Sequence, residues 1–372
     1  KNIKIALIKI KKSISYMNNN ITKNNFDLIR LFAAFQVAIT HASIHLGYKH
    51  PIIDAISFLP GVPIFFFISG FCIYLSYEKS LTNKSPLKNF FMKRALRLYP
   101  ALFFCFLFSV LLAQISGYFS TIEFSIKEFF IWTFTQLTFF QFFNPEFLRG
   151  FGEGSINGSL WTISTELQFY FLTPIIYFLF RKKLIFIIIL ISVFCLLNIL
   201  NSNLNDGSTI ILKLIRVSFL PWVFMFLLGA FIAKKNNLLK KILRINFYSL
   251  VIIFIILSFL SLKLGLTIDN KLNPIIYIVL VFLILKIAFY NPSLSDKLLK
   301  RNDISYGVYV FHMPIVNFLL YKEIFLNSVS GFLLAILATI LISIISWFLI
   351  EKPSMKFKKN QLRKHSISKV FD

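Results

Sequence analysis

Long hydrophobic segments separated by short basic loops make up most of this chain. Ten of them are predicted to form membrane-spanning helices, at residues 26–48, 56–77, 98–115, 160–180, 184–200, 212–233, 247–264, 273–290, 305–321 and 329–350. Each is about long enough as a helix to cross the ~30 Å hydrocarbon core of a bilayer, the fifth marginally. The pattern therefore predicts an all-α, polytopic membrane protein.

The segment at residues 128–143 decides how many times the chain crosses the membrane. It is short and is interrupted by three threonines and a glutamine. If it crossed, every later loop would change sides. If it lies in the interface or re-enters, thirty of the forty Lys and Arg residues fall on one side. Because basic residues concentrate on the cytoplasmic side, the charges favour about ten helices, both termini in the cytoplasm, and an interfacial or re-entrant 128–143 segment.

Composition and charge narrow the class of protein. Of the 372 residues, 57% are hydrophobic and 17% are aromatic, which no ordinary soluble domain approaches. The net charge of +25 would suggest nucleic-acid binding in a soluble chain, but here the basic residues cluster between hydrophobic segments. Nucleic acid is therefore excluded as a partner. The three cysteines fall in hydrophobic segments and show no disulfide or metal-binding spacing.

Three regions follow from this pattern. Residues 1–25 form a basic cytoplasmic leader, predicted to be a short amphipathic helix on the membrane surface or a disordered basic segment. Residues 26–350 form the membrane domain. Residues 351–372 form a basic cytoplasmic tail that is too short for a second folded domain.

The first predicted span carries ionisable residues at membrane depth. Asp27 and Arg30 lie at its start, and His41 and His45 lie farther along. Such groups are costly in hydrocarbon and usually face a polar interior, which makes them candidates for function. On a helix, Arg30 and His41 lie roughly 16 Å apart along the axis at nearly the same azimuth. One face would thus present a cation toward the cytoplasm and an imidazole toward the outside, unless Arg30 only pairs with Asp27.

Glu166 is predicted to lie at the same depth as His41. Each is about seven residues from the outer end of its span, or roughly 10 Å below the outer surface. A carboxylate there could orient the imidazole and stabilise its protonated form, which makes Glu166 a second candidate catalytic residue. The alternative is that each side chain only satisfies a neighbouring helix.

Arg94 and Arg97 precede the third span on the predicted cytoplasmic side. Residues at i and i+3 share one side of a helix, and guanidinium groups match phosphate oxygens. The two arginines are therefore a candidate site for a phosphate-bearing substrate. A charged flank of a membrane span would explain them equally simply.

Four further residues are candidates for lining a cleft or binding substrate: Ser69, Trp161, Tyr306 and His312. Ser69 lies among glycine and proline residues that allow kinks and close helix approach. Ordinary membrane-helix packing also explains such residues. A single histidine on an aromatic helix, like His312, is more often a packed and hydrogen-bonded side chain than a catalyst.

Neither a metal site nor a dinucleotide site is predicted. His41 and His45 have i, i+4 spacing, but no glutamate of the zinc-protease motif lies between them. The glycines at 150, 152 and 154 do not follow a strand, so they indicate a mobile outer loop beside Glu166 rather than a nucleotide-binding turn.

Five segments follow one another along the chain: Arg30 with ten residues before His41, PGVPIFFFISGF, Arg94-Ala-Leu-Arg97 ahead of Tyr99-Pro100, SLWTISTELQFYFLTP and SYGVYVFHMP. In this order they resemble the acyltransferase-3 family of bacterial integral-membrane O-acyltransferases. The resemblance spans residues 26–350 and matches the stand-alone form, without the C-terminal esterase-like domain fused to some members. It implies a ten-helix core, located in the bacterial cytoplasmic (inner) membrane, that transfers an acyl group.

The resemblance also implies the substrates and the roles of the residues. Acetyl from cytoplasmic acetyl-CoA, a donor substrate rather than a bound cofactor, would pass to a hydroxyl of an extracytoplasmic glycan or glycolipid. His41 and Arg30 would be the essential intramembrane pair, and Arg94 and Arg97 would bind the donor. For Glu166 the resemblance supports importance more than a specific role.

Several alternatives stay open from the sequence. His41 could act as a general base or form a transient acyl-histidine. The acceptor, the acyl chain and the oligomeric state are not specified. The competing function is a transporter or flippase of a lipid-linked saccharide, although the repeated halves and paired broken helices common in transporters are not visible in the sequence.

Overall fold

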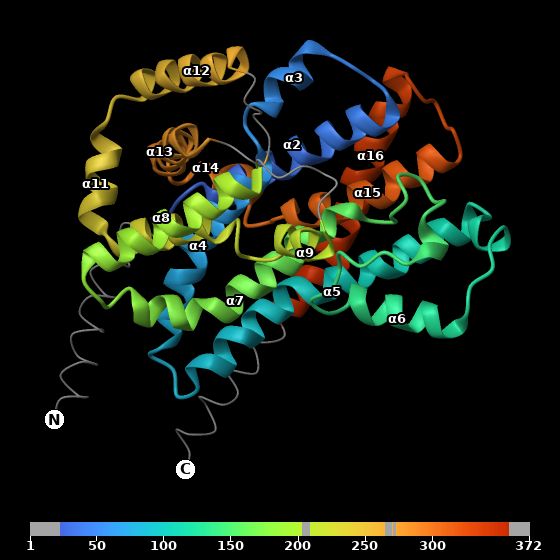
Figure 1. Cartoon of the computed structure of the whole chain (residues 1–372), viewed down its shortest axis with the longest axis horizontal. Helices are drawn as coiled ribbons and strands as arrows, with labels where there is room; N and C mark the ends of the chain where they lie inside the picture. Colours follow the sequence, from blue (N-terminus) through green and yellow to red (C-terminus); the bar gives the residue numbers. More distant parts are fainter. Residues whose placement is uncertain (1–22, 203–208, 265–269, 271–272, 357–372) are drawn as a thin grey trace. The chain divides into compact units, whose positions relative to one another are not determined.

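The computed structural model describes residues 23–202, 209–264, 270 and 273–356, and every regular element among them is helical (Figure 1). The α-helices are α2 (Phe26–Leu46), α3 (Pro51–Ser57), α4 (Gly61–Ser80), α5 (Pro86–Ile115), α6 (Ile126–Gln136), α7 (Trp161–Leu179), α8 (Leu184–Ser202), α9 (Ile210–Val217), α10 (Val223–Lys234), α11 (Asn236–Arg244), α12 (Phe247–Lys263), α13 (Pro274–Tyr290), α14 (Leu294–Leu299), α15 (Ser305–Tyr321) and α16 (Val329–Ser346). Short turns η1 (Tyr118–Ser120), η2 (Glu146–Leu148) and η3 (Gly158–Leu160) are 3₁₀-helical, and η4 (Trp347–Glu351) is π-helical. The predicted all-α fold is confirmed.

Among the described residues, five helical segments are long and apolar enough to cross a membrane. They are Phe26–Leu46, Pro51–Ser80, Pro86–Ile115, Leu184–Asn201 and Val329–Lys356. A sixth candidate is the pair α11 and α12, which is bent by 86° at its break and turns sharply in Figure 1. The count of about ten spans and the cytoplasmic placement of both termini stay predictions. Most of the predicted leader and tail, at residues 1–22 and 357–372, lie outside the described residues.

Helix α6 covers the start of the ambiguous 128–143 segment. It has 11 residues, or about 16 Å of helix, roughly half the hydrocarbon thickness. Ser125 begins it with a capping box, in which Ser125 Oγ accepts from Glu128 N at 3.1 Å and Glu128 Oε2 accepts from Ser125 N at 2.9 Å. The hydrogen bond that the Glu128 carboxylate accepts from the backbone N–H of Ser125 holds the pKa of this carboxyl below its usual value. A helix of this length cannot cross the bilayer alone, and the interfacial or re-entrant placement of the segment stays a prediction.

The prediction of a single helix at residues 212–233 is wrong. The chain forms α9 and α10 there, with a break between them. Pro221 lies in the break and has no N–H to continue a helical ladder. The indole Nε1 of Trp222 donates to the carbonyl oxygen of Arg216 at 2.8 Å, which holds the turn in place.

The described chain forms two compact units. Unit 1 comprises the chain up to Ala33, Ile56–Phe90 and Thr165–Arg301, and unit 2 comprises Ala34–Ala55, Phe91–Ser164 and the chain from Asn302 onward. Helices α2, α3, α5 and α7 contribute residues to both units. The candidate site residues are divided between the two units as well.

In unit 1, helices α4 and α10 pack backbone against backbone. Gly70 of α4 lies against the backbone of Phe226, and Gly229 of α10 lies against the backbone of Phe67. A Cβ atom at either glycine would overlap those backbone atoms. Small residues permit this approach between membrane helices, where lipid removes the usual hydrophobic drive. Gly70 in the PGVPIFFFISGF block therefore serves helix packing.

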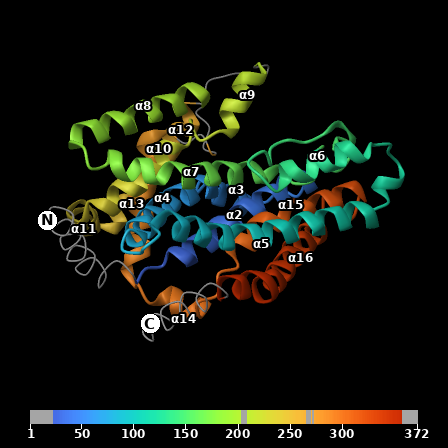
Figure 2. The same ribbon diagram turned by 90° about the horizontal axis from the view of Figure 1, so that it is seen from below.

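In unit 2, helices α15 and α16 lie side by side in both views (Figures 1 and 2). A Cβ atom added at Gly307 of α15 would lie 2.9 Å from the Cβ atom of Ser343 of α16, so the two helices are in close contact there. Residues of α2, α15 and α16 form one apolar core, comprising Ala42, Leu46, Ile315, Val316, Leu319 and Ala335. Around α6 and the loops that flank it lies a second core, comprising Ala113, Tyr118, Trp132, Phe147, Leu148, Phe151 and Ile156.

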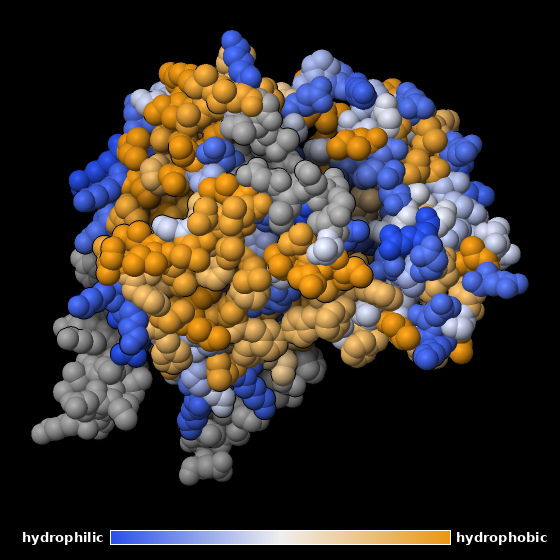
Figure 3. Space-filling model, viewed as in Figure 1, coloured by the Kyte–Doolittle hydropathy of each residue, from blue (hydrophilic) through white to orange (hydrophobic). Residues whose placement is uncertain are grey.

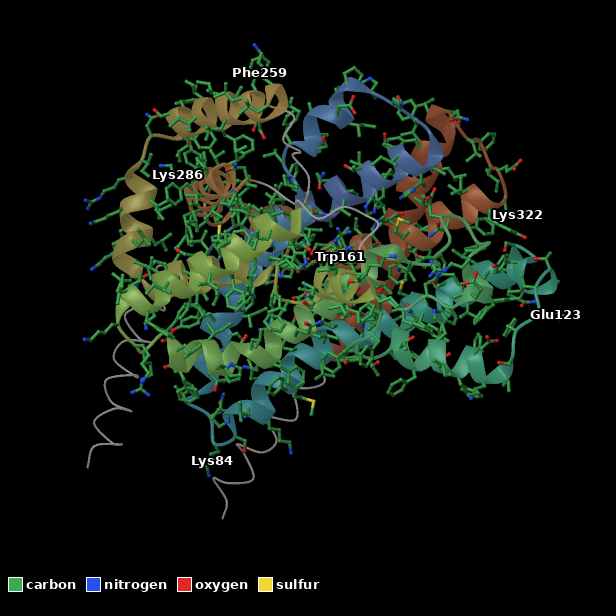
Figure 4. The ribbon with its side chains drawn as sticks, viewed as in Figure 1. Lys84, Glu123, Trp161, Phe259, Lys286 and Lys322 are labelled. Atoms are coloured by element: carbon green, nitrogen blue, oxygen red, sulfur yellow. The ribbon has the colours of Figure 1, made fainter. Side chains whose placement is uncertain are left out.

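The exposed surfaces suit a membrane environment. Figure 3 shows apolar side chains, in orange, over α8 and α12, and residues such as Ile189 and Leu196 are more than half exposed. Helix α11 buries its apolar side chains and exposes Lys240, Lys241 and Arg244, as expected at a membrane interface. Lys286 of α13, labelled in Figure 4, donates to the last turn of α11 at 2.8 Å.

We expect Gly229→Ala to destabilise the protein by roughly 1–3 kcal/mol, because the added methyl group overlaps the Phe67 carbonyl and forces α4 and α10 apart. Thermal unfolding in detergent or nanodiscs measures the effect. The control is Gly158→Ala, whose added Cβ meets only the movable Ser155 Oγ at 3.2 Å. Equal midpoints for the two variants would contradict this account of the α4–α10 contact.

Candidate active site

His41 of α2 and His312 of α15 form a hydrogen-bonded pair in unit 2. The Nδ1 atom of His41 lies 2.9 Å from the Nε2 atom of His312, and the rings stack with centroids 5.1 Å apart. His312 is only 1% exposed, whereas His41 remains partly exposed. The structure thus brings together the predicted catalytic histidine and a predicted cleft-lining residue.

Pro314 explains how α15 is anchored beside this pair. Proline has no N–H, so the Val310 carbonyl, four residues earlier, loses its partner in the helical ladder. Two neighbouring side chains replace that partner: Asn157 Nδ2 donates at 2.8 Å and the Cys105 thiol donates at 3.1 Å. Both hydrogen bonds are made to Val310, two residues before His312, so they hold α15 in place next to the histidine.

Asn317 of α15 holds the glycine-rich loop. Its Oδ1 accepts from Glu153 N at 3.0 Å, and its Nδ2 donates to the carbonyl oxygens of Ser155 and Ile156 at 2.8 and 3.1 Å. Gly152 adopts φ +57° against the Asn317 side chain, a conformation that glycine allows at no steric cost. The loop that the sequence predicts to be mobile is thus tied to α15 by three hydrogen bonds.

That loop brings Glu153 to His45, a pairing that the sequence interpretation missed. The Oε1 atom of Glu153 lies 3.0 Å from His45 Nδ1, and the two side chains are 42% and 21% exposed. His45 lies one turn after His41, with ring centroids 5.8 Å apart. A polar, accessible group therefore adjoins His41 at the C-terminal end of α2. The i, i+4 spacing of the histidines was visible in the sequence, but their neighbour on the loop was not.

Arg97 of α5 forms an ion pair with Asp303, just before α15. Asp303 also accepts a hydrogen bond from Ser305 N at 3.1 Å, which caps the start of α15. A guanidinium has five N–H donors, so this pairing orients the group without using all of them. Arg94 lies one turn earlier on α5 and is half-buried. The phosphate-binding role of the two arginines stays a prediction, and Asp303 is a partner that the sequence interpretation missed.

A buried carboxylate lies close to this ion pair. Glu351 is 1% exposed, is affected by the positive charge of Arg97, and accepts from Ser346 Oγ at 3.0 Å. It ends the π-helical turn η4, an uncommon geometry that is frequently found at functional sites. Two acidic side chains, one just before α15 and one just after α16, therefore influence Arg97.

Glu166 has its hydrogen bonds within unit 1. Its Oε1 accepts from Tyr170 OH at 2.7 Å and from Ser69 Oγ at 3.4 Å. The structure thus brings together two predicted site residues, Glu166 and Ser69. Because His41 belongs to unit 2, its pairing with Glu166 stays a prediction.

Arg30, at the start of α2, also belongs to unit 1. Its Nη1 lies 2.9 Å from Asp27 Oδ1 within the same helix, which matches the alternative role considered from the sequence. A partly exposed i, i+3 pair of this kind contributes little to stability. A functional role for Arg30 therefore stays a prediction.

Trp161 and Tyr306 begin two helices of unit 2. Trp161, labelled in Figure 4, opens α7, and Tyr306 lies in the first turn of α15. The neighbouring Thr162 shares a 2.7 Å hydrogen bond with the hydroxyl of Tyr309, one turn after Tyr306. The start of α7 is therefore fixed to α15 near the histidine pair. Within the described residues, no group of three or more His, Cys, Asp or Glu side chains is placed to hold a metal ion.

Comparison with known proteins gives matches over most of the chain. A family of acyltransferase domains, Acyl_transf_3, matches residues 23–348. Nodulation protein 10 of Rhizobium leguminosarum bv. viciae is 29% identical over 355 residues, covering 90% of this chain and 94% of the relative. An O-acetyl transferase of Shigella phage Sf6 is 27% identical over 342 residues, covering 88% of this chain and 95% of the relative. No solved structure matches significantly.

Asp303→Asn is expected to lower stability by roughly 1–3 kcal/mol, because it removes the negative charge that pairs with the half-buried Arg97. The matched control is Asp296→Asn, which removes a 3.8 Å pair with the highly exposed Arg301 and is expected to have almost no effect. Thermal unfolding of both variants compares them directly. A control that loses as much stability as Asp303→Asn would show that the Arg97 pair has no special importance.

Proposed function

Because the chain belongs to the acyltransferase-3 family and is a membrane O-acyltransferase, we propose that it moves acetyl from cytoplasmic acetyl-CoA to a hydroxyl of an extracytoplasmic cell-surface glycan or glycolipid. The single observation that carries this proposal is the His41–His312 pair at 2.9 Å. It joins a partly exposed imidazole to a buried one, an arrangement suited to proton transfer. The relative from phage Sf6, named as an O-acetyl transferase, supports acetyl as the transferred group.

In the first route, His41 acts as the general base in acetyl transfer. His41 takes the proton of the acceptor hydroxyl, and the oxygen attacks the thioester carbonyl carbon. The carbon–sulfur bond then breaks, and the departing thiolate takes the proton from His41. The products are the acetyl ester and free CoA, and the enzyme returns to its starting state. General-base catalysis of this kind contributes roughly 10²- to 10⁴-fold to the rate.

A covalent route uses the same histidine. A bare ring nitrogen of His41 would attack the thioester carbonyl, release CoA as the thiol, and form an acetyl-imidazole that the acceptor hydroxyl then opens. Both routes need an imidazole nitrogen with a free lone pair. They differ in whether acetyl is ever bound to the protein.

The donor site is proposed at Arg94 and Arg97. Guanidinium groups make strong, charge-assisted hydrogen bonds to phosphate, and acetyl-CoA carries its phosphates at the end opposite the thioester. Asp303 would hold the Arg97 guanidinium in place beside the phosphate. The pantetheine arm would extend from there toward His41.

The remaining site residues would supply a polar path within the membrane domain. Glu166, with its hydroxyl donors Ser69 and Tyr170, and Arg30 are proposed to line that path, as are Trp161 and Tyr306. The protein would be a multi-pass protein of the bacterial cytoplasmic membrane that holds acetyl-CoA only as a substrate.

His41→Ala is expected to lower acetyl transfer by at least about 10²-fold, because it removes the base or nucleophile. Membranes of the source bacterium, with the chromosomal gene replaced by each variant, receive labelled acetyl-CoA, and label in surface glycan is counted. The control is His50→Ala, which alters an exposed residue outside the helices and should retain normal transfer. Wild-type membranes that transport glycan but transfer no acetyl would contradict the enzyme function and favour the transporter alternative.

Arg94→Gln should raise KM for acetyl-CoA roughly 10- to 100-fold with little change in kcat, because one charge-assisted phosphate contact is lost. Lys88→Gln, an exposed position on the same helix, serves as the matched control and should leave both constants near wild type. Steady-state kinetics with acetyl-CoA as the varied substrate makes the comparison. If both variants raise KM equally, only the general positive charge of this region matters.

A further inference from the structure

Glu153 orients the ring of His45, the second histidine of α2. The Oε1 atom of Glu153 lies 3.0 Å from His45 Nδ1. An ionised carboxylate can only accept a hydrogen bond, so the proton between these two atoms belongs to Nδ1 of the imidazole. A neutral His45 therefore carries its free lone pair on Nε2, the ring nitrogen that does not contact Glu153.

Both sides of this contact are anchored to other segments of unit 2. On the loop, the backbone N–H of Glu153 donates to Asn317 Oδ1 at 3.0 Å. On the helix, Leu46 directly follows His45, and its carbonyl oxygen accepts from Asn327 N at 2.7 Å. The Leu46 side chain is buried in the core formed by α2, α15 and α16. The contact between His45 and Glu153 therefore joins two anchored stretches of backbone.

His45 lies next to His41 and is accessible to substrate. The ring centroids of the two histidines are 5.8 Å apart, and the His45 side chain is 21% exposed. A small group such as a hydroxyl that binds beside one ring is therefore within reach of the other.

The two histidines have partners of different chemistry. His41 contacts the imidazole of His312, which supplies no negative charge. His45 contacts a carboxylate, which both orients an imidazole and stabilises the imidazolium that forms when the ring takes up a proton. His45 is therefore the better placed of the two to accept a proton, and His41 is the better placed to carry a neutral acyl group.

We propose that His45 is a further catalytic residue, the general base that takes the proton of the acceptor hydroxyl, and that Glu153 is its positioning residue. His41 then receives acetyl from the thioester. This assignment rests on the proposed acetyl transfer, and it selects the covalent route for that transfer.

The two half-reactions balance with these roles. In the first, a bare nitrogen of His41 attacks the thioester carbonyl carbon, the carbon–sulfur bond breaks, and CoA leaves as the thiol with the ring proton of His41. In the second, the acceptor hydroxyl gives its proton to His45 Nε2 while its oxygen attacks the acetyl carbon. The bond from that carbon to His41 breaks, and His45 returns the proton to the departing ring. Both histidines end in their starting states.

The exposure of the pair separates catalysis from folding. The side chains of His45 and Glu153 are 21% and 42% exposed, and an ion pair this accessible to solvent contributes little to stability. Substitutions at either position should therefore leave the midpoint of thermal unfolding near that of wild type. A loss of activity in such a variant then reports on the reaction.

His45→Gln is expected to block the second half-reaction and spare the first. Protein in nanodiscs receives acetyl-CoA without acceptor, and CoA release is followed with a thiol reagent. Wild type should release about one CoA per protein in a rapid burst, and the variant should do so within about 10-fold of that rate. In membranes of the source bacterium, the variant should place about 10²-fold less labelled acetyl on surface glycan. His50→Gln, at an exposed position, is the control and should match wild type in both assays.

Two results with His45→Gln would overturn the assignment. One is normal labelling of glycan, which would remove His45 from the reaction. The other is an equal loss of CoA release and of glycan labelling, which would place His45 in the first half-reaction or in both.

Variants of Glu153 test the positioning role. Glu153→Gln should lower glycan labelling about 10- to 100-fold, because an amide neither fixes the proton on Nδ1 nor stabilises the imidazolium. Glu153→Asp keeps the carboxylate and should recover most of that loss. The control is Glu146→Gln, which removes an exposed carboxylate from the same loop region and should label glycan normally. Full activity of Glu153→Gln, or no recovery in Glu153→Asp, would contradict the role.

Nuclear magnetic resonance reads the proton position without donor or acceptor. The chain has five histidines, so ¹⁵N labelling of histidine in nanodiscs gives few ring signals, and His45→Gln assigns the one of interest. At a pH that keeps the rings neutral, wild-type His45 should carry its proton on Nδ1, and Glu153→Gln should give a mixture of tautomers. A proton on Nε2 in wild type would contradict the inference.

Failure of this inference differs from failure of the proposed function. Wild-type protein that acetylates glycan but releases no CoA without acceptor would overturn the division of roles and leave acetyl transfer intact. Wild-type membranes that transfer no acetyl would overturn the proposed function itself.

Discussion

A polar group inside a bilayer must find its partner within the protein, and helix α15 shows how unit 2 meets this constraint. Pro314 leaves the Val310 carbonyl without a helical partner, and Asn157 and Cys105 supply new ones. The Nε2 atom of the buried His312 ring also finds its partner within the protein, at Nδ1 of His41. The hydrogen bonds that hold α15 in place therefore also help to position His312 beside His41, the residue proposed to act in catalysis.

Helix α15 also connects the two ends of the proposed reaction. Asp303, just before its first turn, holds Arg97 of the proposed donor site, and Asn317 holds the loop that brings Glu153 to His45. On an α-helix these positions lie about 14 Å before and about 8 Å after His312 along the axis. One anchored helix thus contacts the arginine proposed to bind phosphate, one member of the histidine pair and the loop that carries Glu153.

The sequence predicted those features of the structure that depend on a single segment of the chain. Hydrophobic length and periodicity gave the helices, and an imidazole at membrane depth identified His41, because each signal is local. Contacts between distant segments were not predictable: Asp303 and Asn157 look like ordinary loop residues until their partners are known. The break between α9 and α10 was missed because hydropathy averaged over a window hides a proline turn. The hydrogen bond between His312 and His41 was likewise not predictable, because the two residues are far apart in the sequence.

The central claim is that acetyl-CoA delivers its thioester to His41 within the membrane domain. Cryo-electron microscopy of the protein in nanodiscs, with a ketone analogue of acetyl-CoA that cannot transfer its acyl group, tests it most directly. We predict the phosphates at Arg94 and Arg97 and the ketone carbon roughly 3–4 Å from His41 Nε2, the separation of a near-attack geometry. A fully occupied analogue with its ketone in cytoplasmic solvent, several helical turns from His41, would contradict the account.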